Sequence, residues 1–276
     1  MIRRLNIAGG LISVFTVLCA VVWAFPLYWA AVTTLKPEDE VVQSGFGLIP
    51  RIWTIAGYAF VLLNTNIARW YMNSIITSVS VTVLVLILSA SCGYAISQLR
   101  FTGRTVLWLA ILASFMVPTQ TLIVTHFVLM NDFGLINTLA GVVLPQLIVP
   151  VTIIVYKQFF DSIPKDYREV ALIDGAKEYQ IFWHVFIRMN WGITTALAII
   201  TFIGAWNNFM WPFIAVTQQA KMNVTVGITQ VDDAFGLAYA RNLSGAVLAA
   251  LPVALAYLIF QRRVTQAIML SAGIKG

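Results

Sequence analysis

The sequence predicts an all-α membrane protein with six transmembrane helices. Of its 276 residues, 60% are hydrophobic and 10% are charged, whereas soluble proteins carry about 25% charged residues. The charges are clustered, and six charge-free stretches each reach the roughly 20 residues that a helix needs to cross about 30 Å of hydrocarbon. The expected spans of this single domain, residues 1–276, are 10–34, 73–97, 106–130, 139–159, 191–216 and 243–261.

The basic residues indicate the orientation of these spans. With the N-terminus in the cytoplasm, twelve of the 17 Lys and Arg residues fall in inner segments and five in outer segments. This asymmetry follows the positive-inside rule, so we expect a multi-pass protein of the cytoplasmic (inner) membrane with both termini cytoplasmic. Membrane lipid is then expected to surround the spans. The same distribution accounts for the net charge of +6 without a nucleic-acid surface.

The segments between the spans differ in character. We expect residues 36–70 and 218–241 to lie outside the cytoplasm. Within the first, residues 52–68 are apolar but interrupted, and we expect them to lie against the membrane, with a seventh span as the alternative. Pro118 lies in the third span. Pro145 and Pro150 lie in the fourth, which we therefore expect to be kinked or broken near its outer half.

The cytoplasmic loop at residues 161–188, between the fourth and fifth spans, is amphipathic. Ser162 and Pro164 are helix start signals, and Asp174-Gly175 is a turn dipeptide, so the loop predicts two short helices. Apolar and charged side chains alternate along both. The loop therefore has a face to bury against something other than lipid.

Several kinds of site are missing from the sequence. There is no glycine-rich phosphate-binding loop, no zinc-protease or serine-hydrolase motif, and His126 and His184 are isolated. The expected spans bury no Asp, Glu, Lys or Arg, since Lys157 lies at the cytoplasmic end of the fourth span, although proton-coupled carriers usually bury such groups. We therefore expect no catalytic residue, no metal ligand and no cofactor on this chain. A secondary carrier or a membrane enzyme is a weaker alternative.

The loop contains the sequence Glu169-Val-Ala171-Leu-Ile-Asp174-Gly175-Ala176, followed by Val185 and Ile187. This resembles the EAA signature of ATP-binding-cassette (ABC) importer permeases, which reads E-A-A, three residues, G, nine residues, I-x-L-P. Val170 replaces the first alanine and Arg188 the final proline, which affects how the loop enters the fifth span.

Other segments are similar to the carbohydrate, maltose-type branch of that family. They include the Asn-Ser opening of the second span, a Y-A-x-x-x-L-x-F-x-G-R turn, an M-x-P-x-Q segment, a W-N-x-F-x-W-P element and the C-terminal tail. In this sequence they lie at residues 73–74, 94–104, 116–120, 206–212 and 270–276.

The resemblance implies a permease subunit that moves a carbohydrate, delivered by an extracytoplasmic solute-binding protein, across the membrane. Its implied partners are a second permease subunit, forming a heterodimer, and two cytoplasmic ATPase subunits that bind ATP and Mg. The loop would be the coupling helix, through Glu169, Ala171, Asp174, Gly175 and Ala176. The alternative within the family is a non-sugar solute such as a polyol or glycerol phosphate.

Polar residues within the spans are candidates for the substrate path. Asn207 and Asn208 lie in the outer half of the fifth span, with Trp211 one turn beyond Asn207, and Gln120 follows Pro118 in the third. Buried amides must face partners or a cavity rather than lipid. Amides beside an aromatic ring suit a sugar. The alternative is that the amides form helix–helix hydrogen bonds that stabilise a kink before Pro212.

Overall fold

The structure is a computed structural model that describes residues 7–44, 47–231 and 238–271, with side chains described for 9–43, 47–231 and 238–261. Every regular element in these ranges is helical, which confirms the all-α prediction. Arg3, Arg4 and Lys275, which the charge count includes, and the end of the C-terminal tail lie outside the described residues, as does part of the 218–241 segment.

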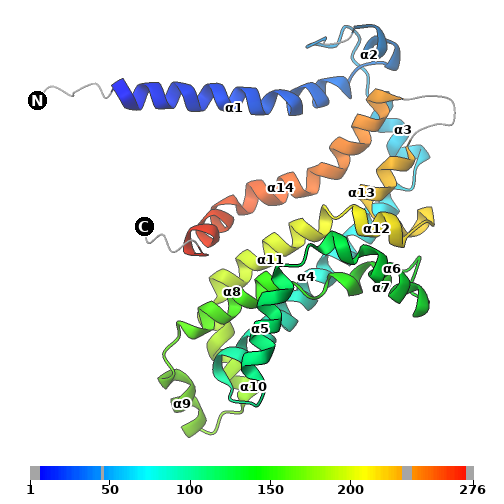
Figure 1. The fold of residues 1–276 in the computed structure, drawn as a ribbon. Helices are drawn as coiled ribbons and strands as arrows, with labels where there is room; N and C mark the ends of the chain where they lie inside the picture. The colour runs from blue at the N-terminus through cyan, green and yellow to red at the C-terminus, as the bar shows by residue number, and fades with distance from the viewer. Residues whose placement is uncertain (1–6, 45–46, 232–237, 272–276) are drawn as a thin grey trace, which may run out of the picture. The chain divides into compact units, whose positions relative to one another are not determined.

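The chain divides into two compact units, and Figure 1 labels their helices. The first comprises Met1–Ile67 and Gly227–Leu251, and the second Ala68–Val226 and Pro252–Gly276. The first unit holds α1 (Ile7–Thr33), α2 (Glu38–Ser44), α3 (Ala56–Asn64) and the start of α14 (Tyr239–Ser271). The second unit holds α4 (Ile67–Gln98), α5 (Arg104–Phe115), α6 (Ile123–Asp132), α7 (Leu139–Val143), α8 (Pro150–Asp161), α9 (Asp166–Ile173), α10 (Glu178–Ile181), α11 (Trp191–Trp206), α12 (Met210–Ala215) and most of α13 (Val224–Gly227).

Three helices are long and apolar enough to cross a membrane unbroken, at Gly9–Thr33, Ile67–Gln98 and Tyr239–Gln261. Three helix pairs pass the same test together but are bent, so the described residues provide up to six spans, in agreement with the predicted number. Two of the bends follow the prolines. The chain turns by 97° between α5 and the segment that starts after Pro118, and by 50° between the α7 segment and α8, which Pro150 opens.

The expected fifth span, residues 191–216, is not one continuous helix. Helix α11 ends at Trp206, and α12 starts at Met210. Pro212 lies in the first turn of α12, where a helix tolerates proline because first-turn N–H groups have no acceptor within the helix. The third bent pair instead joins Glu178–Ile187, within the loop, to α11 at an angle of 84°.

The segment 52–68 contains α3, which has nine residues and is therefore about 14 Å long. That is too short to cross a bilayer, so the structure does not favour a seventh span. In the same unit, Glu38 accepts hydrogen bonds from the backbone N–H groups of Ala240 at 3.2 Å and Arg241 at 2.9 Å. The Arg241 guanidinium lies 3.6 Å from the ring centroid of Phe60. The outer segment is thus tied to the start of α14.

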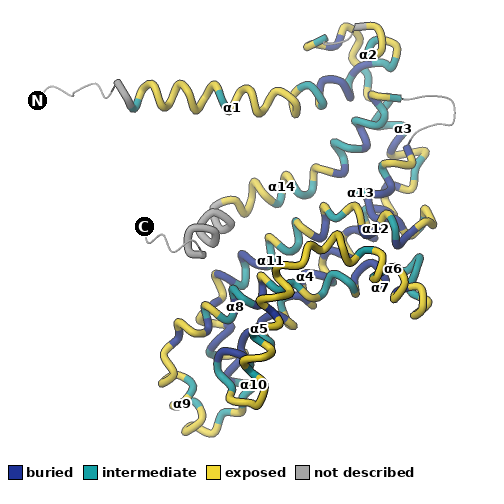
Figure 2. Tube along the Cα trace, in the orientation of Figure 1, coloured by how far each residue is buried: buried dark blue, intermediate teal, exposed yellow. Residues whose placement is uncertain are grey.

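Helix α1 is exposed along most of its length, although it is almost entirely apolar (Figure 2). Trp23 is 82% exposed, and Leu11 and Phe15 exceed 60%. A continuous apolar surface of this size needs lipid or another protein around it. The exposure therefore fits a membrane-spanning helix.

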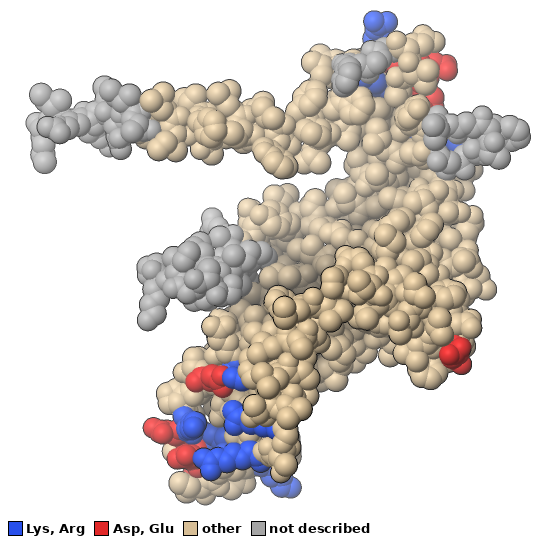
Figure 3. Space-filling view, viewed as in Figure 1, with Lys and Arg blue, Asp and Glu red and all other residues tan. Residues whose placement is uncertain are grey.

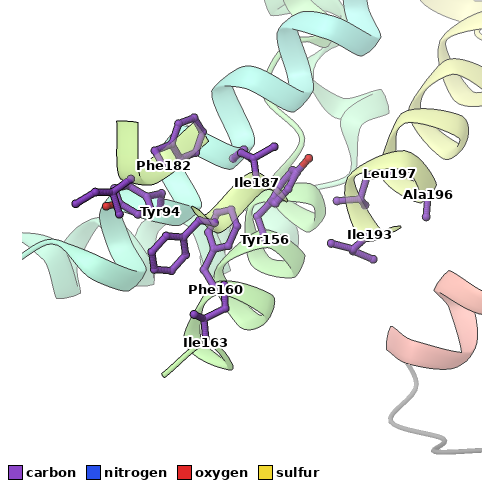
Figure 4. Close-up of a cluster of buried hydrophobic side chains, with 12 residues drawn as sticks. Tyr94, Tyr156, Phe160, Ile163, Phe182, Ile187, Ile193, Ala196 and Leu197 are labelled. Atoms are coloured by element: carbon purple, nitrogen blue, oxygen red, sulfur yellow. The ribbon is translucent and has the colours of Figure 1, made fainter. Parts of the chain in front are cut away.

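The core of the second unit is built from aromatic side chains (Figure 4). Tyr94 of α4 lies 5.0 Å, centroid to centroid, from Phe186 and 6.3 Å from Phe160 of α8, in edge-to-face geometry. Helices α4 and α8 approach closely at Gly93, where a Cβ atom would lie 2.9 Å from the Cβ of Tyr156. Small residues at such crossings allow membrane helices to pack tightly.

The two ends of the second unit are held by different hydrogen bonds. Near the start of α4, the Asn73 amide donates to the carbonyls of Ala220 and Met222. About 36 Å away along α4, Ser97 donates to Asp161 at 2.6 Å. The start of the 218–241 segment therefore lies at one end of this unit, and the start of the 161–188 loop lies at the other.

Candidate functional site

The first candidate site is the loop at residues 161–188, which we call the coupling loop. Helix α9 ends at Ile173, and Gly175 takes a left-handed conformation with φ +80°. The Gly175 N–H donates to the Leu172 carbonyl and the Ala176 N–H to the Ala171 carbonyl, each at 3.0 Å. These two bonds form a Schellman motif, in which a glycine is strongly favoured. The predicted glycine turn is confirmed.

The Schellman motif accounts for the spacing of the EAA signature. Ala171 and Ala176 are the two residues joined by its longer hydrogen bond, and both pack against the aromatic core. Gly175 lies between them, with open space around its Cα atom. The constraint on Gly175 is therefore the backbone conformation rather than steric crowding.

An ion pair closes the coupling loop on itself and attaches it to α4. The Arg168 guanidinium on α9 binds the carboxylate of Glu178, which opens α10. The Tyr94 hydroxyl donates to the same carboxylate at 2.6 Å. Partial burial opposes ionisation of Glu178, but the hydrogen bonds from Arg168 and Tyr94 outweigh it and hold the carboxyl pKa below its usual value. The carboxylate is therefore charged at neutral pH.

Beyond α10 the backbone widens into a π-helix at Phe182–Ile187. The side-chain amide of Asn190 donates to the Phe186 carbonyl at 2.9 Å, where the chain bends into α11. Such π-helical turns are rare and are frequent at functional sites.

The coupling loop presents an apolar surface although it lies among charges. Ile173 is 85% exposed, Tyr179 61% and Val170 56%. Figure 3 shows Lys, Arg, Asp and Glu side chains gathered over this end of the second unit. Of the predicted coupling residues, Ala171, Asp174, Gly175 and Ala176 line one shallow groove of about 450 Å³. Glu169 does not line that groove and instead borders a different cavity.

The second candidate site is a pocket of about 300 Å³, which we call the polar pocket. It lies where three segments are broken, after α5, between α7 and α8, and between α11 and α12. The predicted residues Gln120, Asn208 and Trp211 all line it, but Asn207 does not. Asn207 caps α11 and is exposed, because the helix ends there instead of continuing.

Hydrogen bonds already order part of the polar pocket. The Asn208 amide donates to the Gln146 side-chain carbonyl at 2.7 Å, and Gln146 donates to the Val142 carbonyl at 2.7 Å. The Trp211 indole N–H donates to the Gly141 carbonyl at 3.1 Å, and Trp211 is 5% exposed. Trp211 thus anchors α12 to α7, and the amides provide the polar wall.

Among the lining residues that sequence reasoning missed are His126 and Gln146. His126 is isolated in the sequence, yet its ring lies 5.8 Å from that of Trp211, edge to face. Gln146 follows Pro145 at the predicted break in the fourth span, and that break was the available signal. Among the residues that the structure describes, no cluster of three or more His, Cys, Asp or Glu could hold a metal ion.

Comparisons with known proteins identify the family of this chain. The family described as "Binding-protein-dependent transport system inner membrane component" matches residues 84–268. The diacetylchitobiose uptake system permease protein NgcG of Streptomyces coelicolor is 33% identical over 252 residues, covering 90% of this chain and 83% of the relative. The arabinooligosaccharides transport system permease protein AraQ of Bacillus subtilis is 28% identical, covering 96% and 95%.

A solved structure shares the fold. It is the crystal structure of a bacterial ABC transporter involved in the import of the acidic polysaccharide alginate. One of its chains is 22% identical and superimposes with a TM-score of 0.82, covering 95% of this chain and 98% of that one. NgcG and AraQ are both named as permease proteins. The chain therefore belongs to the binding-protein-dependent transport system inner membrane components, the ABC importer permeases that its sequence resembles.

Proposed function

We propose that this chain is one of two permease subunits of an ABC importer for an oligosaccharide or another uncharged sugar. The observation that carries this proposal is the chemistry of the polar pocket. Amide groups of Gln120, Gln146 and Asn208 line it beside Trp211, and none of its lining residues in the described part of the chain is Lys or Arg. Amides can exchange hydrogen bonds with sugar hydroxyls, and apolar surface suits the C–H face of a sugar.

The same chemistry argues against a phosphorylated solute. Proteins often bind phosphate through Arg and Lys, because charge-assisted hydrogen bonds are about twice as strong as neutral ones. We would expect such a cation in the polar pocket if the solute were glycerol phosphate. The names of the relatives NgcG and AraQ agree with an oligosaccharide.

We infer the orientation from the charges of the second unit. Of the nine Lys and Arg residues in its segment 68–226, seven lie at the coupling-loop end and only Arg69 and Lys221 at the other. By the positive-inside rule the coupling loop faces the cytoplasm, and so do both termini.

The coupling loop then has a partner of definite type. Its exposed apolar side chains, among them Ile173 and Tyr179, lie on a short helix pair held in shape by the Schellman turn and the Arg168–Glu178 pair. An exposed apolar patch of this kind marks a protein contact. Two cytoplasmic ATPase subunits, one for each permease of a heterodimer, would bind there, and ATP and Mg would be bound by them. An extracytoplasmic binding protein would deliver the solute at the opposite end.

The test uses the complete transporter reconstituted in vesicles with its binding protein. We expect Asn208→Ala to lower sugar uptake about tenfold, since it removes one wall amide and takes the Asn208 donor from the side-chain oxygen of Gln146, at a cost of about 1–3 kcal/mol. Asn207→Ala is the matched control, because Asn207 is the neighbouring amide but does not line the pocket. Assembly and basal ATPase activity should be normal in both variants. Equal sugar uptake by the two variants would contradict the proposal that the polar pocket lies on the substrate path. Uptake of glycerol phosphate but not of sugar by the wild type would contradict the proposed class of solute.

A further inference from the structure

A second polar cavity, of about 1030 Å³, lies at the coupling-loop end of the second unit and has no part in the proposed sugar path. It is formed between the turn from α4 to α5, at residues 99–103, and the start of α9. Four cations line it, two from each side. They are Arg100, Arg104, Lys165 and Arg168. We call this cavity the basic cavity.

Not all of these charges are neutralised within the chain. Arg168 is paired with Glu178, and the lining carboxylate of Asp161 is paired with Lys157. Glu169 is the other lining carboxylate. When Arg168 and Asp161 are set aside as paired, the lining contains three further cations, Arg100, Arg104 and Lys165, and one further carboxylate, Glu169. The basic cavity therefore carries an excess of positive charge.

The geometry holds one of the remaining cations in place. The Arg104 guanidinium donates to the carbonyls of Ser97 at 3.2 Å and Leu99 at 3.4 Å. These neutral acceptors fix the side chain without cancelling its charge. Arg100 and Lys165 are exposed and face the same space from opposite walls, so an anion between them would meet cations on more than one side.

The surface beside the basic cavity is apolar. Phe101 in the turn is 41% exposed, and Val106 and Leu107 in the first turn of α5 are 71% and 40% exposed. A ligand with a charged head and an apolar tail would find both halves of its surface matched here. Basic pockets between transmembrane helices are known to hold lipid head groups.

We propose that the basic cavity binds the phosphate group of an anion, and that a phospholipid head group is its natural source. Arg100 and Lys165 contact the phosphate, and Arg104 contributes charge from its fixed position. The lipid would bridge the α4–α5 turn and the coupling loop, so that the membrane itself would help to position the loop. This inference does not depend on the transported solute, and its test measures binding and not uptake.

The test is native mass spectrometry of the purified complete transporter, titrated with phosphatidylglycerol or with phosphatidylcholine. Near a membrane each Lys or Arg contributes about 1 kcal/mol to the binding of anionic lipid, which corresponds to roughly a fivefold change in affinity. We expect Arg100→Gln and Lys165→Gln each to weaken the retention of phosphatidylglycerol by about that factor. Binding of phosphatidylcholine, which has no net charge, should change less.

Arg188→Gln is the matched control, because Arg188 is an exposed cation in the same unit that does not line the basic cavity. A second arm replaces lipid by inorganic phosphate and compares wild-type and Arg100→Gln complexes, so that phosphate binding by the ATPase subunits cancels. If Arg100→Gln abolishes the binding of inorganic phosphate but does not change the retention of lipid, the basic cavity is a phosphate site whose ligand is a soluble anion and not a lipid. If Arg188→Gln weakens lipid retention as much as Arg100→Gln, or if neither lipid nor phosphate distinguishes the variants, the proposal is overturned.

Discussion

In the coupling loop, the residues that fix the backbone are close together in the sequence, whereas in the polar pocket they are far apart. The Schellman turn joins Ala171 to Ala176, and the Arg168–Glu178 pair spans ten residues. In the polar pocket, Asn208 pairs with Gln146 at a separation of 62 residues, and Trp211 with Gly141 at 70. The loop is thus a locally determined shape, and the pocket exists only when three broken helices assemble.

The difference has a functional consequence. A docking element must keep its shape while the spans around it move, and short-range hydrogen bonds provide that. A substrate path must open and close, and a wall made of long-range contacts between separate helices can be rearranged. Changes in the loop should therefore affect coupling, and changes in the pocket should affect passage of the solute.

The largest effect is expected from cysteine labelling, which tests whether the two ends of the second unit lie on opposite sides of the membrane. A cysteine placed at Gln219 should react completely with an impermeant thiol reagent added from outside, and one placed at Lys177 should not react. Cys19 and Cys92 should first be replaced by alanine to remove the background. Labelling at Lys177 but not at Gln219 would reverse the proposed orientation.

Substitution of Gly175 in the Schellman turn tests whether the shape of the coupling loop matters for coupling. The left-handed conformation costs residues other than glycine about 1–2 kcal/mol and is rarer still for β-branched ones. We expect Gly175→Val to lower the number of solute molecules transported per ATP by about tenfold, with the spans still inserted. Gly192→Val is the control, because Gly192 has equally open surroundings and no left-handed φ. A normal transport ratio and normal subunit stoichiometry in Gly175→Val would show that the loop is not the coupling element.

Removing the carboxylate that joins α9, α10 and α4 should have a smaller effect. Glu178→Gln breaks a partly exposed ion pair and weakens the hydrogen bond from Tyr94. Together these losses should cost about 1 kcal/mol of interaction free energy. We expect the transport-to-ATP ratio to fall about fivefold, while Asp166→Asn, in the exposed first turn of α9, leaves it unchanged. An unchanged ratio in Glu178→Gln would mean that the ion pair does not position the loop.

The pH dependence of the same pair can be predicted in sign. The Glu178 pKa is lowered from its ordinary value of 4.5, so the pair contributes fully above that value and is lost only as the pH falls through the lowered pKa. Across the neutral range the coupling ratio of the wild type should therefore not vary because of Glu178. Loss of coupling near neutral pH that Glu178→Gln abolishes would contradict this assignment.

Among the test substitutions, Tyr94→Phe should have the smallest effect. It removes the hydroxyl that donates to Glu178 at 2.6 Å but keeps the ring in the aromatic core. We expect the number of solute molecules transported per ATP to fall two- to threefold. In the double variant with Glu178→Gln, the fall should be smaller than the product of the two single-variant effects. Fully multiplicative effects of the two substitutions would show that the hydroxyl acts elsewhere.

The sequence by itself determined the features that depend on composition or on neighbouring residues. The all-helical class and the number of spans follow from charge-free stretches, because a charge in the bilayer is costly whatever surrounds it. The left-handed turn at Gly175 follows from a short motif. The break before α8 follows from the missing N–H group of Pro150.

Only the tertiary structure decided the features that depend on contacts between distant residues. A charge-free stretch does not reveal where its helix stops, so the break between Trp206 and Met210 and the exclusion of Asn207 from the polar pocket were not foreseen. The pairing of Gln146 with Asn208, the ring of His126 against Trp211 and the link from Tyr94 to Glu178 arise from helix packing. Their physical reason is that buried polar groups must find partners, and which partners lie within reach is set by the packing of the whole unit.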